Sequence, residues 1–463
     1  MGKTYTYRLM GFLLAVAVCL SAFAFIGSGR ADGVVFAAAG DGTLTVHFID
    51  CGQADACVIE FPDGKNMLID AGENKTASYN GIITYIKDNT DIEAFDYFIM
   101  THSDADHIGG VVKVLSEFPA NTVYRPNQQA EYTTPTDTKF YTDPAASASG
   151  SKALYGDYAT KKANTYVNAL EKAYSVADNV YVTNPSDDNI NNITGNATVN
   201  GESFEYTFDF YSPLADAYSD NNNYSPIMVL TYAGRNIVLS GDAEKENERE
   251  FVSLVRDSNK NARYDRFRSG SFKADIIKMG HHGSSTSSSE DYLEIMCSVE
   301  NARRNAYTIF SCGENLSYGH PHEATLQRLM DMKFSAQRIR RTDLQGNVRF
   351  NISARGQISE KHNTEAEISD ILTCGKSNNQ TTHPLVTVKD NGILPSEDNS
   401  DIPDPDVPLA PNPFLTFWNG LAPTVRIVII IAVVIIVILI ITLVIVYYRK
   451  KGKKKKSGKR SRR

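Results

Sequence analysis

The stretch T-H-S-D-A-D-H-I-G-G at residues 101–110 constrains this chain most, because it places two imidazoles and two carboxylates within six residues. The apolar run before it, residues 95–100, predicts a strand, and residues 108–118 predict a helix, so the polar side chains lie on the connecting loop. Imidazole and carboxylate together suit zinc, manganese or iron, and this spacing lets one turn supply ligands to two adjacent ions. The alternative is an acidic helix N-cap, Asp104 or Asp106, beside solvated histidines.

Two later stretches also follow predicted strands. S-G-D at residues 240–242 ends an apolar run, and a carboxylate such as Asp242 is rare at the end of a buried strand without a charged partner. G-H-H-G-S at residues 280–284 follows the next apolar run. Because loops at the ends of successive strands are where a layered α/β sheet builds a site, we expect the three stretches to converge.

Both ends of the chain have the composition of targeting or membrane segments. Residues 1–39 begin with basic residues followed by an apolar run at 9–26, which predicts a signal peptide or signal anchor. Residues 425–448 contain an uncharged run long enough to cross a bilayer as a helix. The basic tail at 449–463 predicts a cytoplasmic C-terminus and an extracellular body; a nucleic-acid-binding arm is the alternative interpretation of this tail.

The charge of the body differs from that of the whole chain. The tail from Arg449 holds 11 of the 47 basic residues and no acidic residue, so residues 1–448 carry a net charge of −18. Such a body disfavours tight, non-specific gripping of long DNA, although a local basic groove is not excluded. Cys51 and Cys57 flank a short turn, and both a disulfide and two unpaired thiols remain open.

The chain between these ends divides into a body and a stalk. In residues 40–356, segments with the apolar pattern of strands alternate with segments that have the pattern of helices. This alternation predicts an α/β body rather than a sandwich of sheets alone. Within it, residues 125–200 predict a surface excursion with one helix near 158–177. Residues 357–424 predict an acidic, proline-rich stalk between the body and the membrane.

Several stretches together resemble a known family. They are H-F-I-D-C-G-Q-A-D-A at 47–56, L-I-D-A-G at 68–72, the 101–110 motif, S-G-D at 240–242, K-M-G-H-H-G-S-S at 278–285, Y-G-H-P-H at 318–322 and R-T-D-L-Q-G-N-V-R-F at 341–350. The order and context resemble the metallo-β-lactamase superfamily. Asp104, where most members have histidine, resembles the nuclease-type, ComEC-like competence hydrolase domains of that superfamily. The resemblance covers residues 43–352 and implies an αββα sandwich.

The resemblance also implies a dinuclear centre of two divalent ions, zinc or manganese. The first ion would take His102 and Asp104, the second would take Asp106, His107 and His281, and Asp242 would bridge both. A third protein ligand for the first ion is not evident, although Asn223 or Ser225 stands in the expected region, so a weakened first site or a single-metal site stays open. His282 is expected in a supporting or substrate-contacting role, because neighbouring side chains on extended backbone point apart.

The chemistry implied by the resemblance is hydrolysis by a metal-activated hydroxide. Asp106 would orient that hydroxide, and His320 or His322 would donate a proton to the leaving group; a structural histidine beside Pro321 is the alternative. Lys278 and Ser284 would contact a phosphate, or else serve as a plain strand lysine and a helix N-cap.

The expected function is that of an exported, membrane-tethered phosphodiester hydrolase, with DNA as the leading substrate by resemblance. Short oligonucleotides, nucleotides or a cell-envelope phosphodiester polymer would suit the acidic body better. One alternative is a hydrolase of a carbonyl ester, lactone or lactam on the same fold. The other is a catalytically degenerate module that binds nucleic acid or a partner. Nothing in the sequence indicates the oligomeric state.

Overall fold

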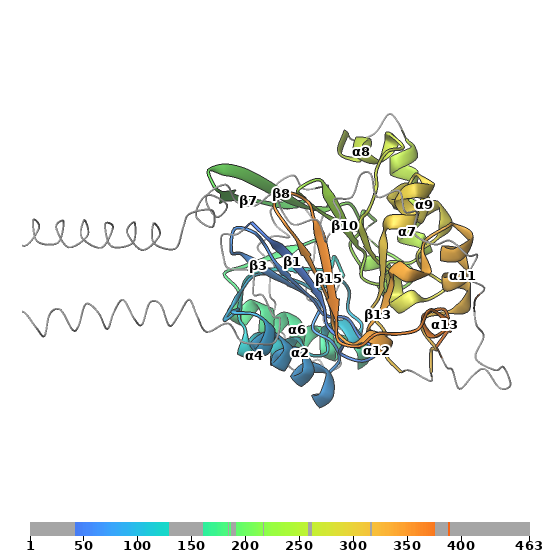
Figure 1. Ribbon diagram of the computed structural model, residues 1–463. Coiled ribbons are helices and arrows are strands. Elements are labelled where there is room, and N and C mark those ends of the chain that lie inside the picture. The colour runs from blue at the N-terminus through green and yellow to red at the C-terminus, as the bar shows by residue number, and fades with distance from the viewer. Residues whose placement is uncertain are drawn as a thin grey trace, which may run out of the picture. The chain divides into compact units, whose positions relative to one another are not determined.

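The computed structural model describes residues 42–128 and 161–375, apart from residues 184, 187–190, 216, 258–261 and 315–316, together with residue 388. The strands form two sheets (Figure 1). The order in the first sheet is β15 (Ile358–His362), β14 (Val348–Ile352), β1 (Leu44–Phe48), β2 (Cys57–Glu60), β3 (Asn66–Ile69), β4 (Phe95–Ile99), β5 (Ala120–Arg125) and β6 (Asn179–Val182). The order in the second is β13 (Ile339–Arg341), β12 (Tyr307–Phe310), β11 (Ile276–Lys278), β10 (Arg235–Leu239), β9 (Met228–Tyr232), β8 (Glu202–Phe210) and β7 (Asn192–Val199).

The two sheets pack face to face, with helices on their outer faces. Phe48 and Phe350 of the first sheet share one buried cluster with Phe208 and Leu230 of the second, so apolar side chains of both sheets fill the space between them. The outer face of the first sheet is covered by α2 (Thr76–Asn89), α3 (Ala105–Ile108), α4 (Val111–Glu117) and α6 (Lys161–Val176). That of the second is covered by α7 (Lys245–Arg256), α8 (Asp265–Arg268), α9 (Glu290–Met296), α11 (Glu323–Asp331) and α13 (Ile368–Ile371) (Figure 1). The predicted αββα sandwich is therefore confirmed.

The polar motifs follow strands that belong to the parallel part of each sheet. Strands β3, β4, β5 and β6 are parallel neighbours, and so are β10, β11, β12 and β13. In open α/β sheets, functional side chains gather outside the carboxyl ends of such strands. The loops after β3, β4, β10 and β11 carry the candidate site here.

The expected surface excursion at residues 125–200 is partly built into the fold. Helix α6 packs Tyr166, Leu170 and Ala173 against the first sheet, at the spacing of one helical face, and β6 extends that sheet beside β5. Residues 192–199 form β7, the edge strand of the second sheet. Residues 129–160 lie outside the described residues.

The body continues beyond residue 356, where the sequence predicts a stalk. Strand β15 pairs with β14 in antiparallel register after a turn closed by Gly356, whose backbone N–H donates to Ser353. Arg341 then holds the following segment, because its guanidinium donates to the carbonyls of Ile371 and Thr373. Residues 358–362 therefore belong to the first sheet as its edge strand, which buries little side-chain surface and leaves a weak apolar pattern.

The expected signal segment (1–39), transmembrane segment (425–448) and tail (449–463) lie outside the described residues, as do residues 376–387 and 389–424 of the expected stalk. Within the part of the chain that the structure describes, none of the helices combines the length and apolarity needed to span a bilayer. Cys51 and Cys57 are both buried free thiols.

Two other helices and several short turns complete the described elements. They are α10 (Glu300–Asn305), α12 (Thr342–Gln345), η1 (Asn221–Tyr224), η2 (Ala262–Tyr264), η3 (Gly280–Gly283) and η4 (Ala336–Arg338).

Candidate metal centre

The ends of four parallel strands bring titratable side chains to one buried region. Asp70 follows β3, His102 and His107 follow β4, Asp242 follows β10, and His281 and His282 follow β11. His107 and Asp106 of the 101–110 motif therefore face Asp242 and His282, which lie 135 and 176 residues further along the chain.

His107 is held between two carboxylates. Its Nδ1 donates to Oδ2 of Asp70 at 2.7 Å, and its Nε2 lies 3.1 Å from Oδ2 of Asp242. Asp70 is fixed in turn, because it accepts from the backbone N–H of Thr101 at 2.9 Å and from the Thr101 hydroxyl at 2.7 Å. Since Asp70 occupies Nδ1, the Nε2 atom is the one that faces Asp242.

His281 and His282 both direct Nε2 toward Asp242. They lie in a left-handed turn with φ of 49° and 54°, and their Nε2 atoms are 3.8 and 3.4 Å from Oδ2 of Asp242. Nδ1 of His281 contacts Oε1 of Glu244 at 3.1 Å, and Nδ1 of His282 donates to the carbonyl of Ser311 at 2.8 Å. Neighbouring side chains point apart only on extended backbone, and the backbone of this turn is not extended. His282 consequently lies as close to the centre as His281.

His102 also has its Nδ1 engaged, and the centroid of its ring lies 4.2 Å from that of His107. Its Nδ1 lies 3.1 Å from the hydroxyl oxygen of Thr101 and 3.2 Å from that of Ser225. The Thr101 hydrogen is donated to Asp70, so the Thr101 oxygen accepts from Nδ1 of His102. Nε2 of His102 is left buried and makes no hydrogen bond to any described residue. All four imidazoles thus have Nδ1 engaged, and Nε2 of His107, His281 and His282 faces Asp242.

The side chains at the centre fit a divalent cation. Asp55, His107, Asp242 and His282 each offer one ligand atom, and these atoms lie within 4.8 Å of one another. Within the described ranges, Oδ1 of Asp55, Oδ1 of Asp242 and Nε2 of His107 are buried without a hydrogen bond. A buried polar atom without a partner costs about 1–3 kcal/mol, and carboxylate oxygens with imidazole nitrogens are the ligands that zinc and manganese prefer.

The centre is strongly polarised. Burial raises the pKa of Asp55, but Lys278, whose Nζ lies 2.5 Å from Oδ2, and His282 bring it down to about 2. Burial lowers the pKa of His282, yet the carboxylates of Asp242 and Asp55 raise it to about 10. Without a cation, the carboxylates therefore hold a proton on His282; a bound cation displaces such a proton.

Asp106 is the most open carboxylate at the centre. Its side chain is 30% exposed, and Oδ2 lies 3.2 Å from Nε2 of His282. Burial raises its pKa, but the hydrogen bond with His282 and the charge of His107 outweigh burial and hold the pKa well below its usual range. Asp106 therefore stays ionised where the centre meets solvent.

The other expected residues lie around this group. Oδ1 of Asp104 accepts from Nδ2 of Asn221 at 3.3 Å, and Asp104 precedes α3 as its N-cap. Asn223 accepts the backbone N–H groups of Glu244 and Asn247, so its carbonyl oxygen supports the loop after β10. The Ser225 hydroxyl accepts a hydrogen bond from the backbone N–H of Asp242 at 3.1 Å, and it lies 3.2 Å from Nδ1 of His102.

Lys278 and Ser284, which we expected to contact a phosphate, have internal partners. Lys278 is buried, and beside Asp55 its Nζ donates to the carbonyls of Gly241 and Met279 at 3.2 and 3.4 Å. The Ser284 hydroxyl is buried and lies 2.9 Å from that of Thr286. In the structure, both residues stabilise the loops that carry the imidazoles.

His320 is held as a neutral imidazole with its proton on Nε2. The backbone N–H of Gly313 donates to Oε1 of Gln53 at 3.2 Å, which fixes the amide orientation of Gln53. Nε2 of Gln53 must then donate to Nδ1 of His320, at 2.9 Å. Burial, followed by the neighbouring His282 and His281, lowers the pKa of His320 to about 2.

His322 uses both ring nitrogens within the protein. Its Nδ1 accepts the backbone N–H of Ser285 at 2.9 Å, and its Nε2 donates to the carbonyl of Tyr318 at 3.0 Å. This pairing joins the 318–322 segment to the turn after η3. Of the two candidate proton donors, His320 is the one whose ring faces His281 and His282, with ring centroids 5.4 and 5.8 Å away.

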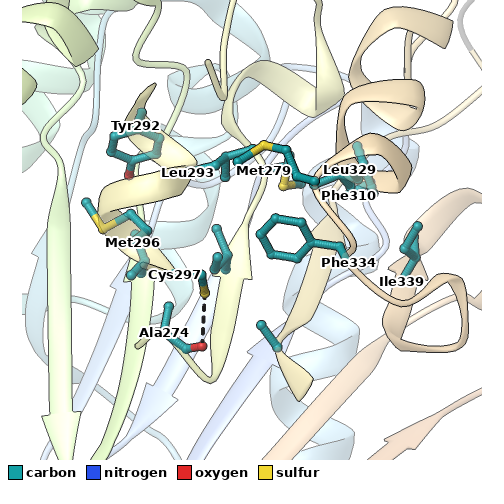
Figure 2. Packing of buried hydrophobic residues seen from close by; sticks show 14 of the residues in the cluster. Ala274, Met279, Tyr292, Leu293, Met296, Cys297, Phe310, Leu329, Phe334 and Ile339 are labelled. Carbon is teal, nitrogen blue, oxygen red and sulfur yellow. Dashed lines mark hydrogen bonds between the residues drawn. The ribbon is translucent and has the colours of Figure 1, made fainter. Parts of the chain in front are cut away.

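Apolar packing fixes the strand ends that carry η3. Met279, directly before the turn, packs in a buried cluster with Phe310 at the end of β12, Leu329 of α11 and Phe334 (Figure 2). Cys297 belongs to the same cluster, and its thiol donates to the carbonyl of Ala274 at 3.5 Å (Figure 2). The turn therefore starts from a rigid base.

Three residues at the centre were not assigned by sequence reasoning. Asp70 directly follows an apolar strand, as Asp242 does, and this is the sequence signal that could have identified it. Asp55 and Gln53 lie on the turn between β1 and β2, inside a stretch that contributed to the family resemblance. Asp55 contacts Lys278 and Gln53 contacts His320, and both partners are more than 200 residues away in the chain. A local sequence pattern therefore cannot predict either contact.

Comparison with known proteins gives a consistent result. A family model described as the metallo-beta-lactamase superfamily matches residues 49–296. ComE operon protein 3 of Bacillus subtilis (strain 168) is 30% identical over 148 residues, which cover 32% of this chain and 16% of that protein. Competence protein ComA of Neisseria gonorrhoeae is 28% identical over 149 residues, which cover 32% of this chain and 18% of that protein. The chain thus spans less than a fifth of the length of either relative.

A solved structure was also found. A mutant metallo-beta-lactamase from Cronobacter sakazakii aligns with 16% identity and a TM-score of 0.25, covering 50% of this chain and 75% of that one.

Proposed function

This chain belongs to the metallo-β-lactamase superfamily, and we propose that it is a hydrolase of phosphodiesters that depends on divalent metal ions, exported and tethered to the membrane. Nucleic acid is the leading substrate class, because relatives named for competence match the chain. The acidic body favours short or single-stranded substrates over long duplex DNA.

The observation that carries the proposal is the shared orientation of four imidazoles. His102, His107, His281 and His282 each have Nδ1 engaged by another protein group, and Nε2 of the last three lies within 3.8 Å of Oδ2 of Asp242. Such outer hydrogen bonds fix the tautomer and ring orientation of metal-binding histidines. A purely structural cluster would not require Nε2 of His102 and Nε2 of His107 to be buried without a hydrogen bond.

The metal would be held by Asp55, His107, Asp242 and His282, with His102, His281 and Asp106 beside them. When bound, divalent cations acidify water and stabilise negative charge on phosphoryl oxygens. Asp70, Ser225, Glu244 and the Ser311 carbonyl orient the imidazoles, so little reorganisation is needed when the cation binds.

Asp106 and His320 have distinct roles in the hydrolysis. The ionised Asp106 accepts a hydrogen bond from the attacking water and orients it toward phosphorus. Water adds to phosphorus, the bond to the leaving oxygen breaks, and that oxygen takes up a proton. His320 offers its Nε2–H to a substrate oxygen, and Gln53 keeps the proton on that nitrogen.

The location of the body outside the membrane rests on the sequence. The apolar runs at 9–26 and 427–446 and the basic residues after the second run favour export with a cytoplasmic C-terminus. Protease protection of the tail, but not of the body, in intact cells tests this topology.

A substrate panel on the full-length protein tests the activity. The protein is loaded with zinc or manganese and assayed on bis(p-nitrophenyl) phosphate, labelled single-stranded DNA, a carboxylic ester and a β-lactam. We expect cleavage of the phosphodiesters that a chelator abolishes and metal restores. Asp106→Asn should lower kcat by at least about 100-fold, whereas the same change at exposed Asp88 of α2 should leave it unaltered.

Other outcomes would replace the proposal. Preferential cleavage of the ester or lactam would make the protein a carbonyl hydrolase. If the parent protein cleaves none of the four substrates with either metal, and Asp106→Asn binds DNA as the parent does, the protein is a binding module.

A further inference from the structure

We propose that Tyr318 is a stacking platform for a nucleobase of the substrate, beside the metal centre; this inference rests on the phosphodiester hydrolysis proposed above. The side chain of Tyr318 is 62% exposed. Among the described residues, the other exposed large apolar side chains are the smaller Val112 and Val299, at 38% and 47%. An exposed aromatic ring beside a polar site offers an apolar face on which a ligand ring can stack.

The ring of Tyr318 continues a series of rings that leads to the centre. Tyr318 and His320 are almost parallel, with planes 13° apart and centroids 5.8 Å apart. His320 and His282 follow at 26° and 5.8 Å, and His282 belongs to the group that fits a cation. A base stacked on Tyr318 therefore lies at the edge of the centre, where its own or the adjoining phosphate can reach the metal ligands.

The backbone of Tyr318 is fixed before any substrate arrives. Its carbonyl accepts from Nε2 of His322, whose Nδ1 accepts from the backbone N–H of Ser285. Ser285 lies two residues after η3, the turn that carries His281 and His282, so the platform and the imidazoles share one support. A platform held in this way binds a base with little loss of backbone freedom.

The charges around the centre favour recognition of bases over recognition of phosphates. Lys278, which the sequence offered as a phosphate contact, is buried against Asp55 and two carbonyls. Asp104 and Asp106, on the loop after β4, add negative charge beside the metal centre, and residues 1–448 carry a net charge of −18. Stacking on an aromatic ring needs no cation and accepts every base, because each base has a π-face. The substrate class that fits is single-stranded nucleic acid, since bases in a duplex are already paired and stacked.

The test compares two substrates of equal charge on the metal-loaded, full-length protein. One is a short single-stranded oligonucleotide, and the other is the same oligomer with abasic sugars on both sides of the scissile phosphate. The measured quantity is the preference, defined as kcat/KM for the base-bearing oligomer divided by kcat/KM for the abasic one. Tyr318→Phe keeps the ring, Tyr318→Ala removes it, and Val299→Ala controls for truncating an exposed apolar side chain elsewhere.

We expect Tyr318→Ala to lower the preference by about 5- to 150-fold, the range that loss of one stacked base gives. Tyr318→Phe and Val299→Ala should keep the preference of the parent. A preference that is the same in the parent and in Tyr318→Ala, or an equal loss with Phe and Ala, would overturn the platform while leaving metal-dependent cleavage intact. Absence of cleavage of both oligomers and of bis(p-nitrophenyl) phosphate by the parent would instead overturn the proposed function, and the platform with it.

Discussion

Oδ2 of Asp70 accepts a hydrogen bond from Nδ1 of His107 at 2.7 Å, on the opposite side of the imidazole from Asp242. The same carboxylate accepts the hydroxyl of Thr101, whose oxygen lies 3.1 Å from Nδ1 of His102. One buried carboxylate at the end of β3 thus orients two imidazoles on the loop after β4.

Asp70→Asn should weaken metal binding without unfolding the protein. Asp70 has a φ of 58°, which asparagine tolerates, so the backbone is kept while an acceptor for His107 becomes a donor. Loss of such an outer hydrogen bond lowers metal affinity by about 10- to 100-fold. Competition with a chromophoric chelator measures the affinity, and Asp91→Asn on an exposed turn is the control. An affinity equal to that of the parent would show that Asp70 has no part in metal binding.

Lys278→Met should destabilise the metal-free protein by about 3–5 kcal/mol. The change keeps the length of the side chain but removes the ammonium that lies 2.5 Å from Asp55, leaving a buried carboxylate without its cation. Urea unfolding measures the free energy. Because a bound metal would also compensate Asp55, added zinc should raise the midpoint more in the variant than in the parent; an equal rise would exclude Asp55 from the metal group.

Gly283→Ala should destabilise the turn that carries the two adjacent histidines. Gly283 has a φ of +88°, and an added Cβ would lie 2.4 Å from Cδ1 of Phe310 and 2.8 Å from Cβ of Pro321. Gly64 has a φ of +87° with open space around it, so Gly64→Ala isolates the backbone cost of about 1–2 kcal/mol. The clash should bring Gly283→Ala to about 2–5 kcal/mol by urea unfolding. Equal losses of unfolding free energy in the two variants would show that Phe310 and Pro321 move away from the added Cβ without an energetic penalty.

His320 should make the metal-free protein less stable in acid. Burial and the neighbouring His282 hold its folded-state pKa at about 2, below the value of about 6.5 in the unfolded chain. Below pH 6.5 the unfolded chain therefore binds a proton that folded His320 does not, so stability is complete above this pH and falls as the pH decreases. The loss approaches about 1.4 kcal/mol per pH unit.

The control for this prediction is His320→Gln, whose amide can accept from Gln53 and still present an N–H. Urea unfolding at several pH values between 7 and 5 should show a pH slope that is smaller in the variant by about one proton. Identical slopes would mean that His320 is protonated in the folded protein.

The sequence was most informative where one segment supplies both the strand and the polar residues. The 101–110 motif and Asp242 follow apolar runs, and the structure brings His107 and Asp242 together. The position of His282 could not be predicted, because it depends on the left-handed backbone of η3. Asp55 could not be predicted as a partner of Lys278, because Asp55 lies on the turn between two strands of the first sheet and Lys278 ends a strand of the second. Strand β15 was missed because its side chains alternate between partial burial and exposure, without an apolar pattern.

The central claim is that side chains from separate strand ends hold a divalent cation. An anomalous difference map at the zinc absorption edge, from crystals of the zinc-loaded protein, tests this claim most directly. We predict a peak about 2.0–2.2 Å from Nε2 of His107, Nε2 of His282 and a carboxylate oxygen of Asp242. A map in which these atoms have no anomalous peak beside them, although the protein contains zinc, would contradict the account.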